Sequence, residues 1–282
     1  MSVGPTVLAR VLGTQLAEKR VAAKITQRDA AKFARISQSK LSEIESGRTP
    51  PSPGDVLVLL RYYKADEPTV EQLLELQQGA EQRGWWNIYR LPQQLELYVG
   101  LESDAVSLRA MELQLVPGIL QSEDYARKLH RLRGLYSCEE VEERVAVRMQ
   151  RQERLVDGSL QLVAVLDEAT LLRCARDPDV AASQLRHLLE RAQLPNVTVR
   201  VLPLGLGLHV GTGGAFSILT FPNKTWKLPD VAHQEYVVGG HIIDDQIVVS
   251  QLDRLFDELR IRALGANESL DLISEFVDSI TT

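Results

Sequence analysis

The sequence contains few cysteines and no long apolar run. Its two cysteines, Cys138 and Cys174, are far apart in the chain, so they supply neither a disulfide framework nor the ligands of a zinc site. We expect both to be small buried residues of a protein in a reducing compartment. No apolar stretch approaches the roughly 18 residues needed to span a bilayer. The sequence therefore argues against a membrane protein.

The sequence also lacks the motifs of common catalytic sites. It has no Gly-x-Ser-x-Gly elbow, no His-Glu-x-x-His pair and no Walker loop. We therefore expect a binding protein and not an enzyme, with no catalytic residue, no metal and no cofactor. The first residues lack the basic start, apolar core and cleavage site of a signal peptide, so we expect a cytoplasmic location.

Charge is distributed unevenly along the 282 residues, whose formal net charge is −6. Residues 1–64 contain 11 Lys and Arg against 5 Asp and Glu, a net charge of +6. The remaining residues contain 21 against 33, a net charge of −12. A basic head on an acidic body indicates that the head meets a polyanion, while the body keeps the molecule in solution.

The basic head contains the pattern of two short helices joined by a tight turn. In "TQRDAAKFARISQSKLSEIESGRTPPS", residues 26–52, Thr26 is a suitable N-cap, and the first helix is predicted from about residue 27 to residue 33 or 34. Ser37 caps a second helix, which Gly47 ends. An amphipathic helix precedes the pair, and another begins near Pro53. This spacing predicts a helix-turn-helix, whose second helix lies in the major groove of DNA.

Polar side chains of these two helices are of the kinds that bind duplex DNA. Glutamine bonds adenine bidentately, lysine reaches guanine acceptors, serine donates or accepts, and glutamate accepts from cytosine. Free amides at a helix start and nearby arginines suit phosphate groups. The predicted base-reading residues are Gln38, Ser39, Lys40, Ser42 and Glu43, and the predicted phosphate contacts are Thr26, Gln27, Arg28 and Arg48.

Residues 6–76 resemble the lambda-repressor-like regulators of the xenobiotic-response-element type. The marks of this resemblance are Gln27, Ala31, the pair Ile36-Ser37, the pair Leu41-Ser42, and Glu45-x-Gly47-Arg48. One position departs from the pattern, because Arg35 stands where glycine is usual. A left-handed arginine costs on the order of 1 kcal/mol relative to glycine.

The remainder of the chain divides into a helical stretch and an α/β module. Trp85 and Trp86 stand between a charged helix and a proline-containing stretch, which indicates a hinge at a domain boundary. Residues 100–115 and the segment after Pro117-Gly118 are predicted to be helical, as is the charged stretch 139–156, whose arginines are expected to face solvent or a partner. From Leu160, short β-branched runs alternate with helices. We therefore predict a mainly α helix-turn-helix domain over 1–82, a helical connector or dimerisation region over 83–158, and an α/β domain over 159–282.

The α/β domain offers two kinds of candidate site. Glu168, His209 and His233 would be needed for a hydrolase, but carboxylates at strand ends commonly cap a helix and lone histidines are usually structural. A ligand pocket beside the "LPLGLGLHVGTGG" loop and a surface that docks a partner protein, through that loop or the 139–156 helix, stay open as alternatives. The candidate ligand or partner residues are Glu168, His209, His233 and Glu235.

An ordered series of motifs extends the resemblance over almost the whole chain. "RGWW", "LESDA", "VPGILQSEDYAR", "RMQRQERL", "VLDEATLLR" and "GAFSILTF" resemble the WhiJ-type regulators of actinobacteria. The resemblance implies a transcriptional regulator with an antitoxin-like C-terminal domain, often paired with a small partner protein encoded nearby.

Together, the residues and the resemblance predict a homodimeric regulator that binds double-stranded DNA and is controlled by a small-molecule effector or a partner protein. Dimerisation is expected because one short reading helix contacts only a few base pairs. The alternative is an antitoxin-like protein that holds a small partner protein and regulates its own operon.

Overall fold

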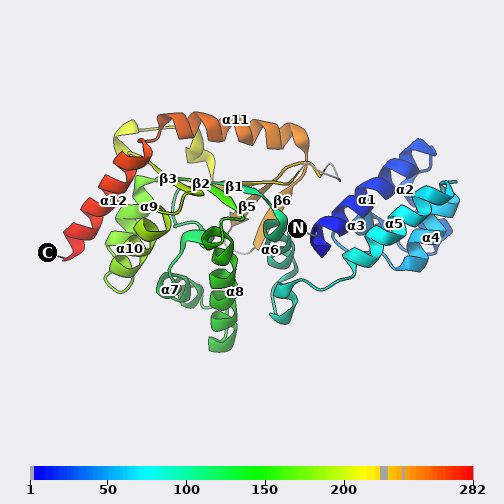
Figure 1. Cartoon of the computed structure of the whole chain (residues 1–282), viewed down its shortest axis with the longest axis horizontal. Coiled ribbons are helices and arrows are strands. Elements are labelled where there is room, and N and C mark those ends of the chain that lie inside the picture. Colours follow the sequence, from blue (N-terminus) through cyan, green and yellow to red (C-terminus); the bar gives the residue numbers. More distant parts are fainter. Residues whose placement is uncertain (1–2, 223–227, 237–238, 282) are drawn as a thin grey trace. The chain divides into compact units, whose positions relative to one another are not determined.

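The computed structural model describes residues 3–222, 228–236 and 239–281, which form two compact units. The N-terminal unit contains residues 3–88, 96–104, 222 and 228, and the C-terminal unit contains residues 89–95, 105–221, 229–236 and 239–281. The first is helical, and the second combines a sheet with helices (Figure 1). This confirms the predicted fold class, a helical helix-turn-helix part followed by an α/β part.

Four helices of the N-terminal unit begin at polar caps that the sequence supplies. The side chains of Thr26, Ser37, Ser52 and Asp66 each accept a hydrogen bond from the backbone amide three residues further on. Such caps satisfy amide groups that the helix itself leaves unpaired. The elements are α1 (Pro5–Ala22), α2 (Gln27–Ala34), α3 (Gln38–Glu45), α4 (Pro53–Tyr62), α5 (Glu67–Ala80), the 3₁₀ turn η1 (Trp85–Ile88) and α6 (Gln93–Asp104).

Helix α3 is held against α1 at very short range. Their contact surrounds Leu12, Leu16, Leu41 and Ile44, all fully buried. Gly13 allows the close approach, because a Cβ atom at this position would lie 2.2 Å from the carbonyl oxygen of Ile44. The position of α3 therefore depends on a glycine in α1.

The tandem tryptophans pack inside the N-terminal unit. Trp86 is buried, and the Nε1 group of Trp85 donates a hydrogen bond to Ser103 Oγ at 3.2 Å. Gly84 and Gly100 leave room for the Trp86 ring. The pair therefore fixes the part of α6 that belongs to this unit.

The sheet of the C-terminal unit has a parallel half and an antiparallel half. Its six described strands lie in the order β3-β2-β1-β4-β5-β6. Strand β1 pairs in parallel with β2 and antiparallel with β4, so the strand direction changes beside β1. The bounds are β1 (Ser107–Glu112), β2 (Gln161–Asp167), β3 (Val197–Leu202), β4 (Phe216–Thr220), β5 (Val231–Tyr236) and β6 (Gly239–Ile243).

Strand β1 corrects the prediction that residues 100–115 are helical. Helix α6 ends at Asp104, and the chain then enters the centre of the sheet. The helical prediction came from the spacing of Leu108, Met111 and Leu115. A strand that is covered on both faces needs apolar residues on both, so the alternation of apolar and polar residues that identifies a strand is weak.

Helices cover both faces of the sheet. Figure 1 shows α11 along one side and α7 and α8 on the other. Phe256 of α11 is fully buried in a cluster with Met111, Val165 and Ile218. The remaining elements are η2 (Gly118–Leu120), α7 (Glu123–Arg133), α8 (Cys138–Val156), α9 (Glu168–Ala175), α10 (Ala181–Arg191), η3 (Leu204–Leu206), η4 (Val210–Gly213), α11 (Gln246–Arg262) and α12 (Ala266–Thr281).

The two cysteines differ from each other in exposure. Cys174 is buried as predicted, but Cys138 is exposed. The prediction for Cys138 was wrong because this residue opens α8 directly after its N-cap, Ser137, where the first turn faces solvent. Among the described residues, every helix is too short or too polar to cross a membrane.

Candidate nucleic-acid interface

The α2–turn–α3 segment forms the helix-turn-helix that the sequence predicts. Asp29 N donates to Thr26 Oγ1 at 3.1 Å, and Lys40 N donates to Ser37 Oγ at 3.0 Å. These two caps start α2 and α3 at the predicted residues. Ala30 and Ala31 are buried, which lets α2 approach its neighbours closely.

The turn between the helices contains a left-handed arginine. Arg35 has a φ angle of 56° and ends α2. Its amide donates to the carbonyl of Lys32, and the amide of Ile36 donates to that of Ala31. With Arg35 at this position, the end of α2 therefore makes the same hydrogen bonds as a helix that ends in glycine. The turn keeps its shape in spite of the conformational cost of a left-handed arginine.

A nearly buried ion pair connects three helices. Arg20 of α1 donates to Glu45 of α3 through Nε at 2.6 Å and Nη2 at 2.9 Å. Gln27, the first residue of α2, donates to the same carboxylate at 3.0 Å. The hydrogen bond to Glu45 raises the pKa of Arg20. Arg20 and Glu45 thus position the reading helix, and Gln27 keeps one amide hydrogen for a phosphate.

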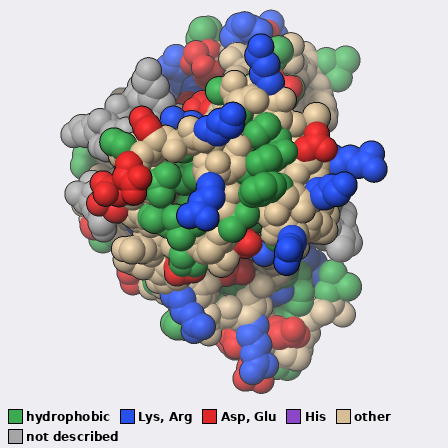
Figure 2. Space-filling view, turned by 90° about the vertical axis from the view of Figure 1, so that its right-hand side faces the viewer, with side chains coloured by type: hydrophobic (Ala, Val, Ile, Leu, Met, Phe, Trp, Pro, Cys, Tyr) green, Lys and Arg blue, Asp and Glu red, His purple; other side chains and the backbone are tan. Residues whose placement is uncertain are grey.

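The outward side of α3 is polar and open to solvent. Gln38, Ser39 and Ser42 are exposed, whereas Leu41 and Ile44 point into the core. Figure 2 shows one face of the molecule, on which Lys and Arg side chains are scattered among hydrophobic, uncharged and acidic ones. The exposed basic residues of the segment are Lys24, Arg28, Lys32, Arg35 and Arg48.

Two predicted base readers have partners within the domain. Lys40 Nζ lies 2.8 Å from Asp55 Oδ2 at the start of α4. Burial opposes ionisation of Asp55, but its hydrogen bonds with Lys40 and Ser52 outweigh burial and lower its pKa. Glu43 accepts a long hydrogen bond from Thr49. Neighbouring side chains therefore orient Lys40 and Glu43, and the ion pair with Asp55 partly balances the positive charge of Lys40.

The structure separates the four candidate residues of the C-terminal unit. His209 Nε2 lies 3.1 Å from Asp167 Oδ2, and His209 Nδ1 accepts from the amide of Gly211. Glu168 accepts from the amide of Leu204 at 2.8 Å. Both residues therefore anchor the glycine-rich loop to the end of β2.

The other two candidates lie on β5. His233 and Glu235 are separated from β2 by β1 and β4, and strands are spaced about 4.8 Å apart. His233 therefore cannot join His209 and Glu168 in one hydrolase site. Glu235 instead pairs with Arg133 of α7 at 3.1 Å.

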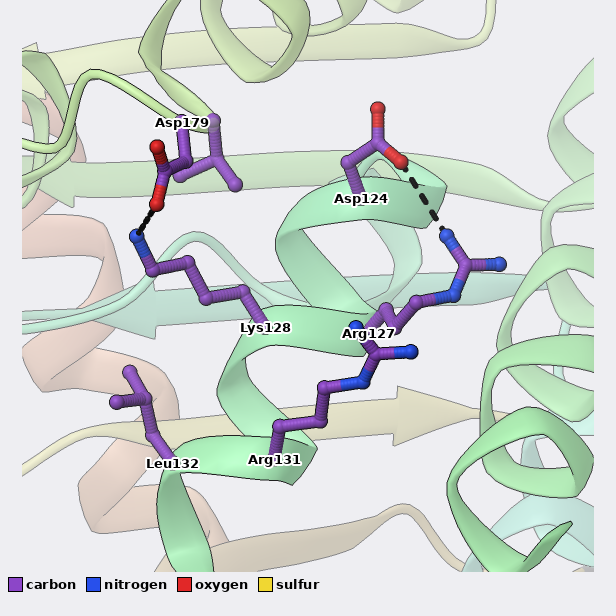
Figure 3. Close-up of a pocket in the computed structure, with 7 residues that line it drawn as sticks. Asp124, Arg127, Lys128, Arg131, Leu132 and Asp179 are labelled. Carbon is purple, nitrogen blue, oxygen red and sulfur yellow. Dashed lines mark hydrogen bonds and ion pairs between the residues drawn. The ribbon is translucent and has the colours of Figure 1, made fainter. Parts of the chain in front are cut away.

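A hollow of about 460 Å³ opens on the outer side of α7 (Figure 3). Arg127 pairs there with Asp124 and Glu142, and Lys128 pairs with Asp179. Because these cations already have carboxylate partners, the hollow has little charge to offer a ligand.

A capped pair of short helices with a polar, exposed second helix defines the helix-turn-helix class of DNA-binding regulators. Residues 11–73 match the family described as a helix-turn-helix domain. Residues 95–275, more than half of the chain, match the family described as a domain of unknown function, DUF5753. The chain belongs to that family. No curated protein matches it.

Proposed function

We propose that the protein is a sequence-specific transcriptional regulator of the WhiJ type, which places α3 in the major groove of double-stranded DNA. The observation that carries the proposal is the exposed polar side of α3, held in place by the Arg20–Glu45 pair. Gln38, Ser39, Lys40, Ser42 and Glu43 would face base edges. Thr26, Gln27, Arg28 and Arg48 would contact the phosphates. Genome-wide mapping of bound sites tests the proposal, since a sequence-specific regulator gives a common motif.

We propose further that the protein binds as a homodimer. Phe33 stacks on Tyr62 with ring centroids 4.0 Å apart, and Phe33, Leu57 and Val58 are exposed. Exposed apolar side chains of this kind suit contact with a second copy. Half-sites about 10 base pairs apart, or a multiple of this, would support the dimer. A motif with a single half-site would contradict it.

Replacing Lys40 by alanine tests base reading by α3. If Lys40 reads a base, Lys40→Ala lowers affinity by about 1–3 kcal/mol at sites with that base and removes the preference at that position. Binding to a panel of operators with single base changes measures this. Lys128→Ala removes another ion-paired lysine, in α7, and should leave affinity unchanged. An equal loss on every sequence, with a shallower salt dependence, would show a phosphate contact instead.

Control of DNA binding is proposed to come from the C-terminal unit, through a small molecule or a partner protein. We propose that this unit binds and does not catalyse. Support comes from His209, whose two ring nitrogens are both engaged, by Asp167 and by the amide of Gly211. A histidine held in this way has no free nitrogen for proton transfer to a substrate.

An antitoxin-like function is the second candidate, and the glycine-rich loop favours it. Leu204, Leu208 and Val210 are exposed, with Leu208 at 90%, while Glu168 and His209 hold the loop in place. Exposed apolar residues on an anchored loop suit a protein partner.

Replacing Leu208 by aspartate separates the two candidates. When a small protein from a gene near this one is co-expressed and co-purifies with the unchanged protein, Leu208→Asp should abolish that co-purification and leave DNA affinity unchanged, because a buried interface excludes an unpaired charge. Ile261→Asp, at another exposed apolar residue, serves as the control. Equal recovery of the small protein with both variants would remove the loop from the interface.

A further inference from the structure

The inner side of α8 carries arginines where a buried helix face usually carries apolar residues. Arg144, Arg148 and Arg151 are four and three residues apart, so they share one side of the helix. Arg144 and Arg151 are buried, and Arg148 is half-buried. Arg133 of α7 completes the arginine cluster, since its charge, with those of Arg144 and Arg151, acts on Arg148. Arginine is seldom fully buried in proteins.

The arginine cluster contains hydrogen-bond donors that the described residues leave unused. Arg148 Nη1 donates to Gln121 Oε1. In contrast, the Nε groups of Arg144 and Arg148 are buried and have no acceptor among the described residues. A buried donor without an acceptor costs about 1–3 kcal/mol. An acceptor that enters from outside would recover this free energy.

Two aromatic rings pack beside Arg144. Its guanidinium lies 3.8 Å from the ring centroid of Tyr136, and His130 packs edge-on against the same ring. Both ring nitrogens of His130 are buried and without a partner in the part of the chain that the structure describes. Burial, followed by the charges of Arg148, Arg144 and Arg133, lowers the pKa of His130 to about 3. His130 is therefore neutral at pH 7 and can donate one hydrogen bond.

The carboxylates of two exposed glutamates interact with the cluster, and the first, Glu140, acts on Arg144. Glu235 pairs with Arg133 at the solvent-exposed end. Burial, with a smaller effect of Glu235, raises the pKa of Glu112 to about 8, so Glu112 is mostly protonated at pH 7. Burial and then Arg151 lower the pKa of Arg148 to about 10, which leaves it positively charged. The positive charges of Arg133, Arg144 and Arg148 therefore outnumber the negative charges of Glu140 and Glu235 at neutral pH.

We propose that the arginine cluster binds a small molecule with a phosphate monoester group, and that this molecule is the effector of the C-terminal unit. The proposal rests on the proposed control of DNA binding, whose ligand it identifies by class. A phosphate monoester carries nearly two negative charges at pH 7 and accepts hydrogen bonds from several guanidinium groups at once. The buried Nε donors of Arg144 and Arg148 would hold the phosphate, and the rest of the molecule would extend past the half-buried Arg133 toward the exposed Glu235.

Calorimetric titration of the full-length protein with inorganic phosphate, at constant ionic strength set with chloride, tests the site. We expect saturable binding. Arg148→Met keeps most of the side-chain volume and should weaken it at least about tenfold, a loss of about 1.4 kcal/mol. Glu235→Gln removes a competing negative charge at an exposed residue and should strengthen binding about threefold or more. Arg127→Met, on the outer side of α7, is the matched control and should bind as the unchanged protein does.

The sign of the Glu235→Gln effect separates a ligand site from a structural ion pair. If Glu235 only stabilises the fold, this variant binds phosphate equally or less well, and the proposal fails even where Arg148→Met does not fold. The proposal is also overturned if the unchanged protein shows no saturable binding of phosphate. Tighter binding of succinate than of phosphate overturns it too, because that would indicate a dicarboxylate ligand. DNA affinity is measured separately. If phosphate binds and DNA affinity stays the same, the effector role is refuted. If the unchanged protein does not bind DNA at all, only the proposed function is refuted.

Discussion

The double variant Ser39→Glu/Ser42→Glu is expected to bind DNA at least about a hundredfold more weakly than the unchanged protein, because like charges placed against each other in an interface cost several kcal/mol. Both serines are exposed on α3, so neither substitution disturbs the core. Residue 39 lies in the first helical turn after the Ser37 cap, where a negative charge stabilises a helix. Loss of binding would therefore not come from unfolding.

An electrophoretic mobility shift assay at low ionic strength measures this effect, with the DNA upstream of the protein's own gene as the probe. Ser250→Glu/Ser279→Glu adds the same charge at exposed serines of α11 and α12 and controls for the change in net charge. The thermal unfolding midpoint should be the same for both double variants. Equal affinity of the two double variants would remove α3 from the DNA interface.

Gly13→Ala is expected to lower the free energy of unfolding of the N-terminal unit by about 3 kcal/mol or more, at the upper end of overpacking effects. The new Cβ would meet two carbonyl oxygens of α3, those of Ile44 and Glu45, at 2.2 and 2.8 Å. Backbone atoms cannot turn aside as a side chain can, so α3 must move. DNA affinity should fall with stability, because the Arg20–Glu45 pair that positions α3 spans the same contact.

Tryptophan fluorescence reports on the N-terminal unit, which contains Trp85 and Trp86. A Trp226→Phe background removes the third tryptophan of the sequence, so that the urea unfolding signal comes from Trp85 and Trp86 alone. Gly54→Ala is the matched control, because the nearest atom to its new Cβ is Ser52 Oγ at 3.8 Å. Alanine is the better helix former by up to about 1 kcal/mol, so this control should not be destabilised. Equal unfolding midpoints would show that α1 and α3 can separate without cost.

Local signals predicted the helix-turn-helix almost to the residue. Thr26 and Ser37 are caps whose effect lies within one turn, and the left-handed Arg35 was expected from the position that glycine usually holds. The Arg20–Glu45 pair was not predicted, because its residues are 25 positions apart. The sequence did contain a signal for this pair. Arg20 lies one helical turn after Leu16, so a charged residue stands on the apolar side of the predicted helix.

The C-terminal unit was harder to predict because its structure depends on distant contacts. Strand β1 was assigned to a helix, and no element was predicted for α12. The arginines of α8 were expected to face solvent or a partner, since charged residues are usually exposed. Their spacing of four and three residues, which places them on one side of the helix, was the signal that could have revealed the cluster.

The pairing of β1 with strands far along the chain has a consequence for synthesis. Helices α1 to α5 all lie within the first 80 residues, so they can pack together while translation continues. Residue 107 of β1, however, pairs with Thr220 of β4. At about 5–20 residues per second, the ribosome needs roughly 5–20 s to add that partner. During this interval a nascent β1 has an open edge, which makes it the segment most in need of protection by a chaperone.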